Sequence, residues 1–120
     1  MLKTLIPNVF YSDIEVGLRL FVKTLGFSVP HEDREAEHAL IVVERDSVKV
    51  HLVENAEFAA KDRPLFRIET DDIEAVYNEV VENNRDYLHP NTSEPTLRPW
   101  GCTKFGVLDE TKVAVVMQQW

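Results

Sequence analysis

Side chains that can bind a ligand or take part in chemistry alternate along residues 98–109. If this stretch is a β-strand, successive side chains point to opposite faces. One face would then carry an indole, a thiol and an amine: Trp100, Cys102 and Lys104. The opposite face is expected to join the core through Phe105, Val107 and Asp109. Because Gly101 permits a bulge or a close backbone approach beside the indole, the first face is typical of a pocket wall.

The same stretch carries a family resemblance. Pro99-Trp100-Gly101, followed after three residues by Phe105-x-Val107-x-Asp109, resembles the last-but-one strand of the bleomycin-resistance proteins. These belong to the vicinal-oxygen-chelate superfamily, with the glyoxalases and extradiol dioxygenases. Residues 7–13, the Leu25-Gly26-Phe27 helix exit and the order of elements also fit, so the resemblance covers nearly the whole chain. It implies the fold of that superfamily and its non-enzymatic branch.

The first half of the chain reads as a strand, a helix and further strands. Residues 2–11 alternate imperfectly and contain Pro7, which predicts an edge or first strand. Ser12 is expected to cap a helix and Glu15 to close its capping box, and Gly26 is expected to end that helix. The apolar stripe of this helix recurs at helical spacing: Ile14, Leu18, Phe21, Val22 and Leu25. A strand starting at residues 27–29 and a hairpin of residues 39–43 and 48–53 complete this half.

The second half repeats the pattern. At an offset of 59 residues, four positions are identical: Asp13 and Asp72, Ile14 and Ile73, Glu15 and Glu74, Val22 and Val81. Residues 65–69 read as a strand, a capped helix opens at residues 71–74 with an apolar stripe that reaches Val81, and residues 91–97 read as a mobile rim. We therefore predict an α+β fold of two tandem βαβββ modules with mixed sheets. The modules are residues 1–57 and 63–120 of a single domain, residues 1–120, joined by a short polar connector in which a helical turn can form.

Each predicted sheet buries the side that faces its helix and leaves the other side concave. Two such sheets, from one chain or from two chains that exchange halves, would enclose a cleft. Strand alternation places eight side chains in it: Asn8, Phe10, His51, Arg67, Glu69, Trp100, Cys102 and Lys104. Aromatic surface with scattered donors and acceptors suits a planar or extended polar ligand. The alternatives are a solvated rim position for each polar residue and core packing for Trp100.

The resemblance also allows a test for metal. In the enzymes of the superfamily the cleft holds a divalent ion, bound near the start of each module's first strand and in each module's last strand. Those positions hold Ile6, Leu65 and residues 114–116, which are all apolar. Only His51 remains as a donor, and one imidazole does not make a catalytic metal site. We therefore expect no bound metal, no cofactor and no catalytic residue.

The composition of the chain limits the kinds of partner that it can bind. The chain has 120 residues, 44% of them hydrophobic, and a net charge of −8. This acidity argues against nucleic acid and leaves a cationic ligand open, although acidity can simply aid solubility. No apolar run approaches the roughly 18 residues of a membrane span, and no signal peptide follows Met1. A lone Cys102 fits a reducing compartment, so we expect a cytoplasmic protein.

Three functions are consistent with these features. The leading one is a non-catalytic small-molecule-binding protein that resembles the bleomycin-resistance proteins. It would sequester a polar or cationic, partly planar ligand, such as an antibiotic, in the cleft of a homodimer. Glu69 is essentially the only acid expected in that cleft, which leaves the identity of the ligand open. The alternatives are a metal-free or atypical lyase or isomerase that uses His51, Glu69 or Cys102, and a metabolite-binding or regulatory module.

Overall fold

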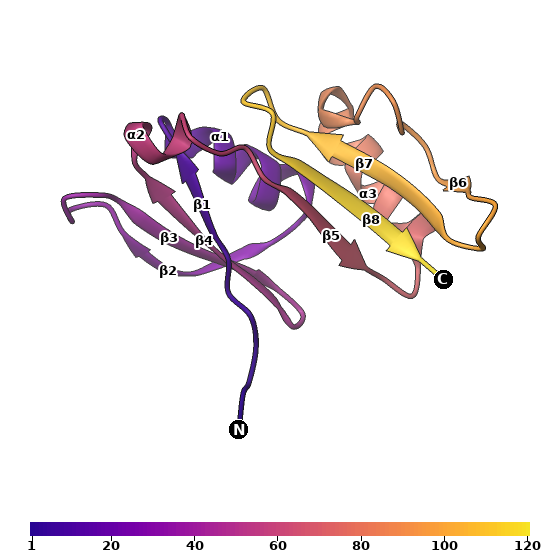
Figure 1. The fold of residues 1–120 in the computed structure, drawn as a ribbon, viewed down its shortest axis with the longest axis horizontal. Coiled ribbons are helices and arrows are strands. Elements are labelled where there is room, and N and C mark those ends of the chain that lie inside the picture. Colours follow the sequence, from indigo (N-terminus) through magenta and orange to yellow (C-terminus); the bar gives the residue numbers. More distant parts are fainter. The chain divides into compact units, whose positions relative to one another are not determined.

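The computed structural model describes all of residues 1–120, which form two compact units, residues 1–62 and 63–120 (Figure 1). The elements of the first unit are β1 (Asn8–Tyr11), α1 (Ile14–Leu18) continued by η1 (Arg19–Thr24), β2 (Ser28–Asp33), β3 (Leu40–Arg45), β4 (Val48–Glu54) and α2 (Ala56–Ala59). The elements of the second unit are β5 (Leu65–Glu69), α3 (Ile73–Asn84) continued by η2 (Arg85–Tyr87), β6 (Thr96–Leu97), β7 (Thr103–Leu108) and β8 (Ala114–Gln119). The predicted α+β class and the order strand, helix, three strands are confirmed.

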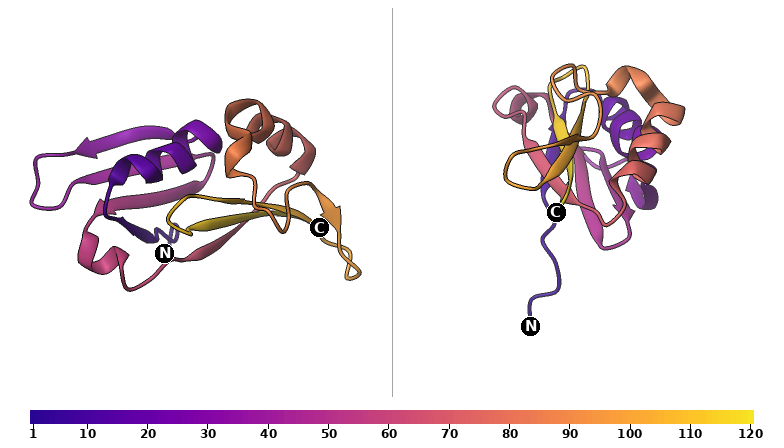
Figure 2. Two further views of the ribbon diagram at one scale, coloured as in Figure 1. Left: turned by 90° about the horizontal axis from the view of Figure 1, so that it is seen from above. Right: turned by 90° about the vertical axis from the view of Figure 1, so that its right-hand side faces the viewer.

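The two sheets have the same topology. Their strand orders are β1-β4-β3-β2 and β5-β8-β7-β6. In each sheet the first strand pairs in parallel with the last strand of the unit, and the other pairs are antiparallel. One helix lies over one face of each sheet, α1 in the first unit and α3 in the second (Figure 2). Each unit therefore has one covered and one open sheet face.

In the first unit, alternate strand residues are buried on the covered face: Val9, Tyr11, Ile41, Val43, Val50 and Leu52. The first helix can approach this layer because residue 17 is a glycine. A Cβ atom there would lie 2.6 Å from the ring of Tyr11. Leu20 and Phe21 from η1 complete the core. The exit at Gly26 is also confirmed, since Gly26 has a φ of 73° and its N–H donates to the carbonyl oxygen of Val22 at 3.2 Å.

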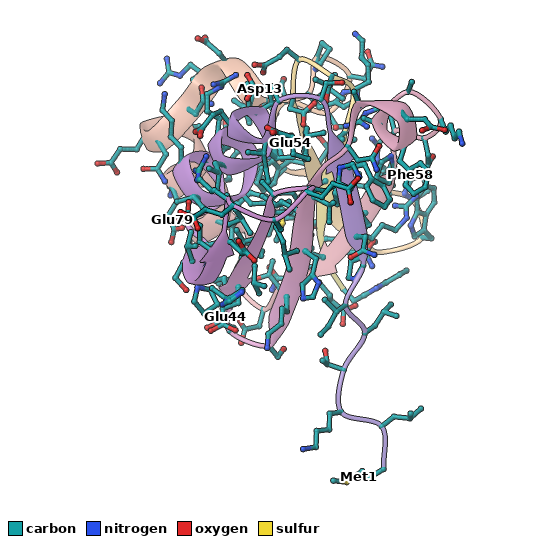
Figure 3. The ribbon with its side chains drawn as sticks, turned by 90° about the vertical axis from the view of Figure 1, so that its left-hand side faces the viewer. Met1, Asp13, Glu44, Glu54, Phe58 and Glu79 are labelled. Atoms are coloured by element: carbon teal, nitrogen blue, oxygen red, sulfur yellow. The ribbon has the colours of Figure 1, made fainter.

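The start of the first helix differs from the prediction. Asp13, not Ser12, is the capping residue, and its side chain accepts a hydrogen bond from the N–H of Glu15 at 3.0 Å. Asp13 has the extended backbone that a capping residue needs. A second acceptor comes from the end of β4, where the Glu54 carboxylate accepts from the N–H of Ile14 at 3.0 Å. Asp13 and Glu54 both lie at this end of the helix in Figure 3.

The second unit repeats this arrangement with different residues. Asp72 caps α3 by accepting from the N–H of Ala75 at 3.1 Å. The side-chain amide of Gln119, at the end of β8, accepts from the N–H of Ile73 at 2.9 Å and donates to the carbonyl oxygen of Asp71 at 2.9 Å. The covered face packs against α3 and includes an edge-to-face contact between Tyr77 and Phe105, with 5.4 Å between ring centroids. In both units, the last strand thus binds the start of the helix.

A buried carboxylate shapes the turn between β7 and β8. Asp109 is 2% exposed. Its Oδ1 atom accepts hydrogen bonds from the N–H and the hydroxyl of Thr111, both at 2.7 Å, and from the N–H of Val113 at 3.1 Å. Asp109 therefore satisfies donors of a turn in which Lys112 adopts a positive φ of 77°.

The first strand is shorter than predicted. It begins at Asn8, and residues 1–7 lie outside any strand. The predicted strand from residue 2 is therefore wrong for residues 2–7, where Pro7 lacks the N–H that a ladder requires. Met1, Leu2 and Leu5 are exposed along this segment, which extends away from the sheet (Figure 3). No helix in the structure has the length and apolar character needed to cross a membrane.

Candidate functional site

The open face of the first sheet carries a row of side chains from all four strands. Asn8 on β1 lies opposite His51 on β4, His51 opposite Val42 on β3, and Val42 opposite His31 on β2. Directly opposed residues on one face are close enough for their side chains to interact. Two predicted site residues, Asn8 and His51, are thus direct neighbours.

The next row of this face is more apolar, and an aromatic side chain from outside the sheet extends it. Phe10 lies opposite Val53, and Val53 lies opposite Leu40. Phe58, from α2, packs edge-to-face on Phe10 with 5.1 Å between ring centroids and remains 43% exposed (Figure 3). The Lys61 ammonium stands 5.0 Å from the centroid of the Phe58 ring. The first open face therefore combines an aromatic pair with amide and imidazole groups.

The open face of the second sheet is more polar. Glu69 on β5 lies opposite Gln118 on β8, Gln118 opposite Lys104 on β7, and Lys104 opposite Thr96 on β6. In the adjacent row, Arg67 lies opposite Val116. Arg67, Glu69 and Lys104 form no ion pair with any residue. This row presents donors and acceptors of both charges to solvent.

Part of the second open face is covered. A Cβ atom on Gly106 would lie 2.8 Å from the Thr92 hydroxyl oxygen and 3.2 Å from the His89 Cβ atom. The backbone of Gly106 is also hydrogen-bonded to His89 and Thr92, at 2.8 and 2.9 Å. Residues 89–92 therefore pack against β7, and Gly106 makes that approach possible. The accessible part of the face is the row from Glu69 to Thr96 and its flank at Arg67.

Trp100 stands beside this row but not in the strand. The strand begins at Thr103, and residues 98–101 form a turn closed by a 2.9 Å hydrogen bond from the Gly101 N–H to the Arg98 carbonyl oxygen. Gly101 has a φ of 95°, which glycine adopts without strain. The expected strand position of Trp100 is therefore wrong. Its indole is 61% exposed, and the Lys104 ammonium lies 5.7 Å from the ring centroid.

Cys102 follows this turn and is buried, with 2% of its surface exposed. Its sulfur lies 3.7 Å from the carbonyl oxygen of Thr103. The thiol is therefore poorly accessible to a ligand or substrate. The structure brings Trp100 and Lys104 together, places Glu69 in the row of Lys104 and Arg67 in the next, and leaves Cys102 beneath the surface. Asn8, Phe10 and His51 belong to the open face of the other unit.

No protein-family model and no curated protein sequence matches the chain. Solved structures do match. A bleomycin-binding protein complexed with bleomycin gives a TM-score of 0.75 at 16% identity, with 99% of each chain covered. A bleomycin resistance determinant encoded on the transposon Tn5 gives 0.76 at 16% identity, with 98% of each chain covered. The chain has the glyoxalase/bleomycin-resistance fold. A glyoxalase/bleomycin resistance protein from Catenulispora acidiphila agrees, with a TM-score of 0.75 at 17% identity over 98% of this chain and 97% of that one.

In the glyoxalase/bleomycin-resistance fold of this chain, the positions at which metal ligands were expected carry hydrocarbon side chains. Ile6 precedes β1, Leu65 begins β5, and Ala114 and Val115 begin β8. No three His, Cys, Asp or Glu side chains lie close enough together to hold an ion.

We expect the purified protein to contain no stoichiometric divalent metal, because hydrocarbon side chains cannot coordinate one. Elemental analysis of protein purified without chelator measures this directly. Addition of EDTA is expected to leave the unfolding temperature unchanged, since no metal-binding free energy would be lost. One tightly held ion per chain would contradict the prediction.

Two residues of the open faces were absent from the predicted site. Gln118 shares the alternation of Ala114 and Val116 on β8, so the strand pattern could have identified it. Phe58 lies in the connector, where a helical turn is consistent with the sequence, but strand alternation does not show that this aromatic side chain reaches the sheet. The signal for that turn is Asn55, which caps α2 by accepting a hydrogen bond from the N–H of Phe58 at 3.0 Å. Asn is a preferred N-cap residue, because its side-chain oxygen accepts from a backbone N–H of the first helical turn.

Proposed function

We propose that this chain is a non-catalytic protein that binds and sequesters a polar, partly planar small molecule on its open sheet faces. The observation that carries the proposal is the exposed Trp100 indole beside the unpaired polar row of Glu69, Gln118 and Lys104. An accessible aromatic ring with a few fixed polar groups is the usual composition of a small-molecule site. The structural similarity to a bleomycin-binding protein complexed with bleomycin also supports a ligand-binding function.

The arrangement of reactive groups favours binding over catalysis. A nucleophile needs accessibility and a base within hydrogen-bond reach, whereas Cys102 is buried and its thiol donates to the carbonyl oxygen of Thr103. The His51 side chain forms no hydrogen bond with an orienting acid. Glu69 has no basic partner either. These groups can hold a ligand but do not form an acid–base pair.

A ligand screen followed by recovery of the ligand tests this function. Thermal shift against antibiotics and aromatic metabolites should identify stabilising compounds, because a ligand at a hundred times its dissociation constant adds about 2.7 kcal/mol. The compound is then recovered from the complex and analysed by mass spectrometry. Sequestration requires it to be recovered unchanged after prolonged incubation. A chemically altered compound, formed only with protein, would contradict the proposal.

We also propose that the protein is a homodimer whose subunits cover open sheet faces. These faces include half-exposed apolar groups, among them Phe58 and Leu65, at 43% and 56% exposure. A symmetric partner would bury them on both subunits at once. Sedimentation velocity at micromolar concentration should therefore give the mass of two chains. A single monomeric species over that concentration range would count against the dimer.

A further inference from the structure

The acids and bases of the second unit are segregated. Glu69 is the one acidic residue in the four strands of this unit, whereas its strands carry two cations, Arg67 and Lys104. The other acids lie mainly on and beside α3, which covers the opposite face of the sheet. The overall charge of −8 therefore does not describe the open face, where positive charge is in excess.

These cations are also unpaired. In the first unit the comparable strand lysine, Lys49, has its ammonium 3.7 Å from the Glu44 carboxylate. Arg67 and Lys104 have no such carboxylate. The Lys104 ammonium instead lies 5.7 Å from the centroid of the Trp100 ring. An unpaired cation beside an exposed aromatic ring can bind a carboxylate attached to a planar group.

A third cation adjoins the turn that carries Trp100. Arg98 is half-buried, and its Nε atom is buried without a hydrogen-bond partner. A buried atom is not accessible to a ligand, so this Nε is not counted among the ligand-binding donors. Arg98 contributes positive charge beside the Trp100 turn.

We propose that the ligand of this chain is an aromatic carboxylate, with its ring against Trp100 and its carboxylate at Lys104. Arg67 and Arg98 add to the positive field. This inference rests on the proposed function and narrows it, because overall acidity alone would favour a cationic ligand. Glu69, at the far end of the row, disfavours a second carboxylate there and would accept a hydrogen bond from a donor on the ligand.

Three probes with the same ring test which sign of ligand charge the site prefers: phenylpropionate, phenylpropanol and phenylpropylamine. Isothermal titration calorimetry is expected to show the carboxylate binding about tenfold more tightly than the amine, with the alcohol between them. The advantage of the carboxylate should shrink as salt is added, because exposed charges are screened. Amide NMR shifts should locate its binding at β7 and the Trp100 turn.

Substitutions of Lys104 test whether its ammonium binds the carboxylate of the ligand. Lys104→Gln is expected to lower the affinity for phenylpropionate about fivefold and to leave phenylpropanol nearly unchanged, while Lys104→Arg should retain binding. Lys23→Gln, an exposed lysine of η1, is the matched control and should have no effect. Equal or stronger binding of the amine would overturn the aromatic-carboxylate inference and leave the proposed function standing. Binding of none of the probes at millimolar concentration would count against both.

Discussion

Asp109→Ala is expected to lower the free energy of unfolding by about 3 kcal/mol, the largest effect that we predict. The substitution removes the acceptor of three hydrogen bonds from Thr111 and Val113 at a site that is 2% exposed. Two of those donors are backbone N–H groups of the turn. Urea unfolding followed by circular dichroism measures the change as a shift of the midpoint at constant slope.

Two variants separate the buried carboxylate from a general loss of negative charge. Asp86→Ala removes an exposed acid from η2 in the same unit and should change stability by less than about 0.5 kcal/mol. Asp109→Asn keeps an acceptor oxygen and should fall between Asp109→Ala and the parent. If Asp109→Ala were as stable as Asp86→Ala, the turn would not depend on this carboxylate.

Trp100→Ala is expected to weaken the binding of phenylpropionate by about 1 to 3 kcal/mol, the usual cost of losing one aromatic contact. Its effect on fold stability should be less than about 1 kcal/mol, because an indole that is 61% exposed contributes little packing. A buried indole would instead cost about 3 to 5 kcal/mol. Calorimetric titration and urea unfolding of the same variant measure both quantities.

Fluorescence gives an independent reading of Trp100. The chain has two tryptophans, so Trp120→Phe leaves Trp100 as the only indole. Binding of phenylpropionate should then change the emission, since the ring lies at the site. Trp100→Phe keeps an aromatic ring and should retain most of the affinity. A Trp100→Ala protein that binds as tightly as the parent would place the ligand elsewhere.

The fold could be predicted because its pattern is local and repeated. Apolar residues at helical spacing and alternating strands mark the covered faces, and the identities between Asp13 and Asp72 and between Ile14 and Ile73 mark the repeat. The same alternation puts Asn8 and Phe10 on one face of their strand and Arg67 and Glu69 on one face of theirs, which follows from strand geometry alone. The register that sets Asn8 opposite His51 depends on the pairing of β1 with β4.

The rest of the site depends on contacts that alternation does not encode. Trp100 lies outside the strand because Pro99 and Gly101 favour a turn. Strand alternation compares only every second residue, so it does not detect this turn. Phe58 reaches the sheet through a helical turn in a polar connector. The burial of Cys102 depends on neighbours distant in sequence. The first helix is capped by Asp13 and not by Ser12. Both residues have side chains that can cap a helix, so the sequence alone does not distinguish them.

The closing strand of each unit has a consequence for the order of folding during synthesis. In the first unit β4 pairs with both β1 and β3, and its end binds the start of α1 through Glu54. That unit can therefore close as soon as residue 54 has left the ribosome. In the second unit β8 pairs with both β5 and β7 and Gln119 binds the start of α3, and these residues follow every other element of that unit in the chain. Removal of residues 114–120 would take away the partner of β5, the partner of β7 and the Gln119 acceptor at the helix start together, so the second unit would lose its sheet while the first unit kept its own strand pairs.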